Sequence, residues 1–208
     1  MRLIPWVIPA VLACGSSERT DPGAGGSGGS AGAGAGNTPP GDAAAGECNP
    51  VIAQPTVGVG VHQDLCAPIS YDTNPPSGGP HYFRWAAFQN YDFAVPEGFL
   101  VHSLEHGTIV YWYNCGAEGC RAEVAAAEAM IDGLPVDPAC AGQGAERRVI
   151  LTPSETLTTR WAASAWGWTL RADCFDAAVF ENFYLEHFGG APEDFCNAGL
   201  VITEDTCP

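Results

Sequence analysis

Residues 108–132 have the sequence TIVYWYNCGAEGCRAEVAAAEAMID, and the periodicity changes within this stretch. Its first six residues are β-branched or aromatic, a composition typical of a buried strand. Residues 122–132 are rich in Ala and Glu, with apolar side chains at helical spacing. Gly133 and Pro135 end that pattern. The stretch therefore predicts a strand followed by a helix.

Further regular elements follow toward the C-terminus. Residues 148–152 (RVILT) and 160–171 (RWAASAWGWTLR) are predicted strands, and the intervening PSET with its flanks is predicted to be a hairpin connection. Residues 175–188 carry an apolar helical stripe that Gly189 and Gly190 end, and a short strand is expected at 200–203. The order β-α-β-β-α-β is that of the ferredoxin-like split βαβ unit. We therefore expect an α+β domain in which a small antiparallel sheet carries two helices.

The first 46 residues contain little that could form a core. Residues 1–13 combine Arg2 with an apolar run too short to span a bilayer, which predicts a signal peptide. The following VLAC resembles a lipobox, in which Cys14 would be lipidated after cleavage; a plain signal peptide is the alternative. Residues 14–46 are rich in Gly, Ser and Ala and predict a flexible tether. A single folded domain is expected over residues 47–208, with a loop-rich beginning that includes a short strand at 57–61.

The chain is strongly acidic. It has 24 acidic and 8 basic residues, a formal net charge of −16. Residues 47–208 hold 21 of the acidic residues and 6 arginines, so the charge belongs to the domain. Such a field repels phosphate, which argues against nucleic acid as a partner and against binding anionic lipid through a basic patch.

The cysteine content predicts a disulfide-bonded domain. The chain has nine cysteines, and eight remain when Cys14 is set aside. An even number in an exported chain is typical of disulfides, although the pairing cannot be derived from the sequence. A thiolate metal site is the alternative, and it has little support because the sequence contains no Cys-x-x-Cys pair. The predicted disulfide cysteines are Cys48, Cys66, Cys115, Cys120, Cys140, Cys174, Cys196 and Cys207.

Three side chains that can bind a metal occur within residues 102–107, HSLEHG. On a helix His102, Glu105 and His106 would share one face, whereas on a strand Glu105 would point away from both histidines. Gly107 is a good helix terminator, which favours a short helix that ends there. The alternative is a buried polar network without metal.

A second motif, residues 74–81, has the sequence NPPSGGPH and is dense in turn-forming residues. It could be a structural loop, or it could position His81 as a further ligand beside His102 and His106. His62 and His187 lie outside both motifs, and His187 is interpreted as structural or surface-exposed.

The ligand types limit the choice of metal. Imidazole and carboxylate together suit zinc, copper(II) or iron(II). A soft copper(I) site is disfavoured, because Met130 is the only methionine after the predicted signal peptide and the cysteines are expected to be oxidised. Ligand histidines must be unprotonated, so affinity is expected to fall as the pH drops through ~6 to 7. The letters His-x-x-Glu-His also occur in inverted zincin proteases, where Glu105 would activate water. That mechanism needs a long helix and a later carboxylate ligand, for which Glu181 and Glu186 are the helical candidates.

These motifs together resemble a bacterial family, domain of unknown function 3105. The shared features are the PP-x-SG-x-H loop, the H-S-L-E-H-G motif and an A-W-G strand, over residues 62–190. The resemblance implies an exported or membrane-tethered domain with a site built from His81, His102, Glu105 and His106, and it implies no established activity. The eight domain cysteines and the lipobox-like start depart from the usual pattern.

The sequence thus predicts an envelope lipoprotein, anchored to a membrane by its N-terminal lipid and facing the periplasm or the exterior, that binds a divalent metal through a His/Glu cluster. Two alternatives remain. One is a metal-dependent hydrolase in which Glu105 acts on water, and the other is a structural or partner-binding lipoprotein without metal.

Overall fold

Strand β4 (Ile109–Tyr113) is buried on both faces, because its side chains alternate between two apolar clusters. Ile109 and Tyr111 contribute to one cluster, and Val110 and Trp112 to the other. This is the period-two alternation of a strand between two packed layers. The computed structural model describes residues 48–207, so the predicted signal peptide, Cys14 and the tether lie outside the described residues.

The main sheet has five strands in the order β1-β7-β6-β4-β5. All neighbours are antiparallel except β4 and β5, which are parallel and are connected through α2. A separate pair of short parallel strands, β2 and β3, lies outside this sheet. The remaining strands are β1 (Val51–Ala53), β2 (His62–Gln63), β3 (His81–Tyr82), β5 (Val149–Pro153), β6 (Trp161–Ala165) and β7 (Trp168–Ala172).

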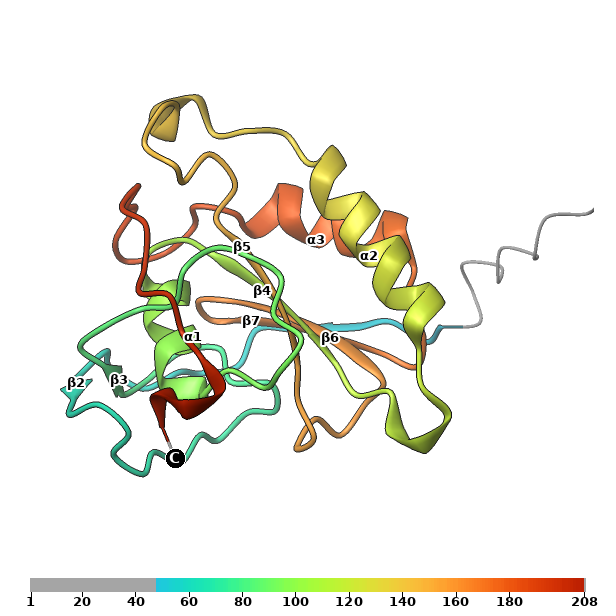
Figure 1. Cartoon of the computed structure of the whole chain (residues 1–208), viewed down its shortest axis with the longest axis horizontal. Coiled ribbons are helices and arrows are strands. Elements are labelled where there is room, and N and C mark those ends of the chain that lie inside the picture. Colours follow the sequence, from blue (N-terminus) through green and yellow to red (C-terminus); the bar gives the residue numbers. More distant parts are fainter. Residues whose placement is uncertain (1–47, 208) are drawn as a thin grey trace, which may run out of the picture. The chain divides into compact units, whose positions relative to one another are not determined.

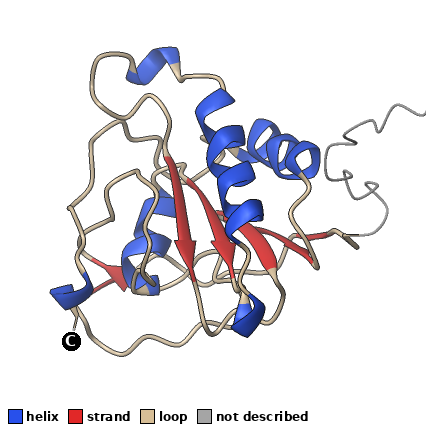
Figure 2. Cartoon of the chain, turned by 45° about the vertical axis from the view of Figure 1, so that its right-hand side comes forward, coloured by secondary structure: helices blue, strands red, loops and turns tan. Residues whose placement is uncertain are grey.

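Three α-helices cover the sheet. Helices α2 (Arg121–Gly133) and α3 (Ala177–His187) pack on one face, and α1 (Glu97–Glu105) packs on the other together with β3. Figure 1 shows this division, with α2 and α3 side by side and α1 near β2 and β3. Figure 2 shows the same helices relative to the strands in red. The short 3-10 helices are η1 (Gly116–Glu118), η2 (Pro138–Cys140) and η3 (Glu204–Thr206).

The predicted α+β class with an antiparallel sheet is confirmed, and the connections differ from the expected ones. In a split βαβ unit another strand separates the two helix-linked strands, whereas β4 and β5 are direct neighbours. The predicted hairpin between β5 and β6 does not form, because β6 pairs with β4 and β7 instead. The hairpin is β6–β7, with Gly167 in its turn at φ +75°.

Two predicted strands are absent from the described residues. The chain is irregular at 57–61, and the nearest strand is β2. At 200–203 only an isolated bridge forms, between Leu200 and Ala86. The sequence also predicted two helices with the sheet, and α1 is the third, the short helix expected at the HSLEHG motif.

All eight domain cysteines form disulfides, as expected. Three of the bonds join distant parts of the chain, with sequence separations of 126, 141 and 56 residues. Disulfides of this kind persist in oxidising compartments, so they indicate a protein that works outside the cytoplasm. Among the helices of residues 48–207, none is long and apolar enough to cross a membrane. The pairs are Cys48–Cys174, Cys66–Cys207, Cys115–Cys120 and Cys140–Cys196.

Candidate metal centre

The proline- and glycine-rich loop delivers His81 into the interior. His81 is the first residue of β3 and is fully buried. Its Nδ1 lies 2.9 Å from the carbonyl oxygen of Gly79. The loop itself is tied to the β6–β7 turn, where the Gly167 amide donates to the Ser77 carbonyl at 2.7 Å. The loop thus fixes the orientation of the imidazole.

Helix α1 supplies His102 and Glu105 from one face. The helix begins after Pro96 and ends before Gly107, whose φ of +84° is the left-handed conformation that terminates helices. His102 is 3% exposed, and its Nδ1 lies 2.6 Å from the Tyr82 carbonyl oxygen. Their separation of three positions brings His102 and Glu105 to the same side of the helix, as predicted.

His81 and His102 share an arrangement that is typical of metal ligands. In each ring Nδ1 faces a backbone carbonyl, so that nitrogen carries the proton and donates it. Nε2 is then the unprotonated nitrogen of the neutral ring. Metal-binding histidines generally use one ring nitrogen for the ion and donate the other N–H to a carbonyl or carboxylate.

Four side chains meet at this place. Ligand atoms of His62, His81, His102 and Glu105 all lie within 4.8 Å of one another. His81 Nε2 is 3.0 Å from Glu105 Oε2, but the two atoms are not aligned as a hydrogen bond. Two ligands of one tetrahedral zinc lie about 3.3 Å apart, so this pair is already at ligand spacing.

The four side chains of the group differ in their exposure to solvent. His81 and His102 are buried, whereas His62 is exposed and the Glu105 side chain is 13% exposed. The His62 ring centroid lies 5.1 Å from that of His81 and 4.9 Å from that of His102. An ion would enter past His62 and Glu105 and would meet the two buried imidazoles inside.

The segment before His62 fits closely against the carboxylate. A Cβ added at Gly60 would collide with Glu105 Oε1 and would lie 3.2 Å from His81 Cε1. The absence of a side chain at Gly60 therefore allows the backbone to pass directly beside Glu105.

Burial keeps the inner imidazoles neutral. It lowers the pKa of His81 below the usual value, and it lowers the pKa of His102 to about 3. Neighbouring imidazoles contribute to this low pKa of His102, and the bond to the Tyr82 carbonyl partly opposes it. Protons therefore compete with a metal at these rings only at a lower pH than the ~6 to 7 expected from an ordinary histidine.

The structure sorts the predicted ligands into two places. His81, His102 and Glu105 come together, and His62, which the sequence analysis set aside, joins them. His106 is not one of this group of four. It is buried beside His102, at 4.6 Å between ring centroids, and its Nδ1 lies 3.2 Å from Glu193 Oε2.

His62 was missed because its signal is not local. It pairs with His81 across the parallel β2–β3 bridge, and this pairing joins segments 19 positions apart. Asp64 and Cys66 follow His62 in the sequence, but neither belongs to the group of four, and Cys66 is in a disulfide. His187 was interpreted as structural or surface-exposed, and it stacks on Trp168 with ring centroids 4.4 Å apart at the end of α3.

The geometry differs from that of an inverted zincin. Helix α1 has only nine residues and leads directly into β4. Glu181 and Glu186 are exposed on α3, which packs on the opposite face of the sheet. Glu105 itself is one of the four side chains whose possible ligand atoms lie within 4.8 Å of one another.

These features define a disulfide-bonded α+β domain with a His/Glu cluster beside helix α1. The chain belongs to the family described as "Protein of unknown function (DUF3105)", which matches residues 62–198. The match confirms the resemblance inferred from the two histidine motifs and includes all four residues of the cluster. No curated protein and no solved structure matches the chain.

Proposed function

We propose that this protein binds one divalent transition-metal ion through His62, His81, His102 and Glu105. The observation that carries the proposal is the meeting of four ligand atoms within 4.8 Å. Nδ1 of each of the two buried imidazoles faces a backbone carbonyl, so Nε2 is left for the ion.

The ligand set indicates which ions fit. Three imidazoles and one carboxylate suit zinc, copper(II) or iron(II). Every cysteine in residues 48–207 is in a disulfide, so no thiolate is offered for a soft ion. The low pKa of the two buried histidines means that they bind without first losing a proton at neutral pH.

The proposal extends to the location of the protein. The disulfides indicate an oxidising compartment, and the VLAC sequence that ends at Cys14 is a lipobox-like signal. We therefore place the domain in the cell envelope, held to a membrane by a lipid on Cys14 and facing the periplasm or the exterior. Residues 14–46 would act as the tether.

Metal analysis of the disulfide-bonded chain tests the proposed site. After loading with Zn²⁺ and dialysis, the wild type is expected to retain one tightly bound ion per chain. His102→Gln is expected to lose it, because a buried ligand is removed. His187→Gln is the matched control, since that histidine lies at the end of α3 and outside the cluster.

The thermal midpoint separates a metal site from a polar core network. Zn²⁺ is expected to raise the midpoint of the wild type, because an ion that binds only the folded state stabilises it. Zn²⁺ is expected to raise the midpoint of His62→Gln by less, because one ligand is missing. This variant is expected to fold, because His62 is exposed and its replacement leaves the core intact. If neither His102→Gln nor His62→Gln changes metal retention, the cluster is a structural network and the proposal is wrong.

A further inference from the structure

We propose that His106 and Glu193 form a second, weaker position for a divalent transition-metal ion, separate from the group of four. The position lies at the C-terminal end of α1, where residues 189–200 cross it after helix α3. We refer to residues 189–200 as the crossing segment.

The crossing segment is bonded to the end of α1. The amide of Gly189 donates to the Gly107 carbonyl at 3.0 Å, and the amide of Glu193 donates to the Glu105 carbonyl at 3.0 Å. The last carbonyls of a helix lack partners within the helix, so the Glu193 amide satisfies the carbonyl of the last residue of α1. The backbone of Glu193 is thereby fixed beside the helix that carries His102 and His106.

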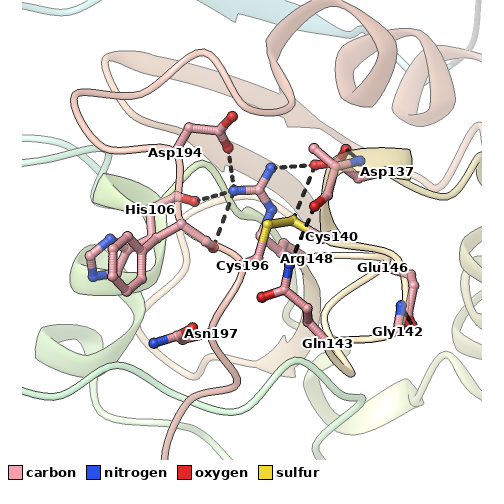
Figure 3. The surroundings of a disulfide bond; sticks show 12 residues. His106, Asp137, Cys140, Gly142, Gln143, Glu146, Arg148, Asp194, Cys196 and Asn197 are labelled. Carbon is pink, nitrogen blue, oxygen red and sulfur yellow. Dashed lines mark hydrogen bonds and ion pairs between the residues drawn. A yellow bond between two sulfur atoms is a disulfide. The ribbon is translucent and has the colours of Figure 1, made fainter.

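Two further features hold the crossing segment in place, and Figure 3 shows both. Arg148 is fully buried and donates from Nη1 to the His106 carbonyl at 2.7 Å and to the Asp194 carboxylate. Its Nη2 donates to Asp137 at 2.9 Å. The Cys140–Cys196 disulfide attaches the same segment to the loop after α2. The segment is therefore a fixed part of the fold, although the side chain of Glu193 is 55% exposed.

The His106 ring is buried without a hydrogen bond. It is 4% exposed, and neither ring nitrogen has a hydrogen-bond partner among the described residues. Its faces contact Trp85, at 4.7 Å between ring centroids, and Phe195, at 5.1 Å. A buried polar group without a partner is costly, so such a group in a native fold calls for a ligand.

Glu193 supplies the second ligand atom. Its Oε2 lies 3.2 Å from His106 Nδ1, and the two atoms are not aligned as a hydrogen bond. The same relation holds between His81 Nε2 and Glu105 Oε2, at 3.0 Å. Both distances are close to the separation of about 3.3 Å between two ligands of one tetrahedral ion. An ion held by Nδ1 and Oε2 would satisfy the buried nitrogen.

The environment indicates a weaker position than the first. The pair provides two protein ligands, and the exposure of Glu193 leaves room for water to complete the coordination. The net charge of −16 raises the local concentration of cations around the domain. The His106 ring lies beside that of His102, with ring centroids 4.6 Å apart. An ion bound by His106 and Glu193 would therefore lie next to the group of four.

Equilibrium dialysis of the full disulfide-bonded chain with Zn²⁺ tests the inference. The wild type is expected to bind a second ion roughly tenfold or more weakly than the first, since two protein ligands replace four. Glu193→Gln is expected to lose the weaker ion and keep the tighter one. Glu181→Gln removes an exposed carboxylate on α3 with the same change of charge and is expected to keep both.

The two proposals fail in different ways. His81→Gln is expected to lose the tighter ion while the weaker one stays, because His81 does not contact Glu193. A single ion in the wild type that His81→Gln removes would overturn this inference and leave the proposed function standing. A single ion that only Glu193→Gln removes would support this inference and overturn the proposed function. Two ions that both remain in Glu193→Gln would overturn it as well.

Discussion

The two faces of the five-stranded sheet bury different kinds of side chain. The face under α2 and α3 is almost wholly apolar, with Trp161, Phe180 and Phe183 at its centre. The face under α1 also has an apolar cluster, but histidines and serines are buried close to it, including His81, His102 and Ser103. The comparison indicates that one face is built for apolar packing and that the other carries the candidate site. On the face under α1, loops and backbone carbonyls orient the buried histidines.

The largest expected effect lies on the apolar face. Phe183 is fully buried between α3 and the sheet, so Phe183→Ala is expected to lower the free energy of unfolding by about 3 to 5 kcal/mol. Urea unfolding of the metal-free protein measures this loss. The Zn²⁺ affinity of the folded fraction is expected to stay at the wild-type value. A large loss of affinity in that fraction would show that the two faces are not separable.

The second effect, on pH dependence, belongs to the face under α1. The pKa of His102 is about 3 in the folded protein and about 6.5 when unfolded, so only the unfolded chain gains a proton between these values. The free energy of unfolding is therefore highest, as far as His102 is concerned, above about pH 6.5, and it falls progressively as the pH drops toward 3. Burial lowers the pKa of His81 and His106 as well, which acts in the same direction.

Urea unfolding in the presence of a chelator measures this pH dependence. Between pH 7.5 and 5.5 the His102 contribution is expected to reduce the free energy of unfolding by on the order of 1 kcal/mol. Folded His102→Gln is expected to lose less stability over the same interval. Equal stability of the wild type at both pH values would contradict a neutral buried His102.

The smallest effect concerns the fit of the chain around Glu105. A Cβ at Gly60 would displace the Glu105 carboxylate, so Gly60→Ala is expected to weaken Zn²⁺ binding by roughly tenfold. Gly58→Ala is the matched control, because its Cβ would lie at an ordinary 3.7 Å from Gly79 Cα. Titration with Zn²⁺ compares the two variants. Equal affinities would mean that the position of Glu105 does not limit binding.

Much of the regular structure could be predicted because it depends on local patterns. The β-branched and aromatic composition of TIVYWY and the helical stripes of residues 122–132 and 175–188 correspond to β4, α2 and α3. Gly107 was expected to end a short helix at the HSLEHG motif, and α1 ends just before it. These features follow from side-chain shape and backbone freedom over a few residues.

The strand order could not be predicted in the same way. The sequence placed PSET in a hairpin, yet β5 and β6 lie on opposite sides of β4. Nothing in the residues 153–160 forbids a hairpin. The outcome depends on whether β6 pairs with β5 or with β4. That choice involves contacts across the whole sheet.

The sequence by itself determined the presence of strands and helices, the common side of His102 and Glu105, and an even set of cysteines suited to disulfides. Only the tertiary structure decided the cysteine pairing, the entry of His62 into the cluster and the approach of Glu193 to His106. The physical reason is range: periodicity and turn chemistry act over a few residues, whereas His62, His81 and Glu193 come from segments that meet only when the chain is folded.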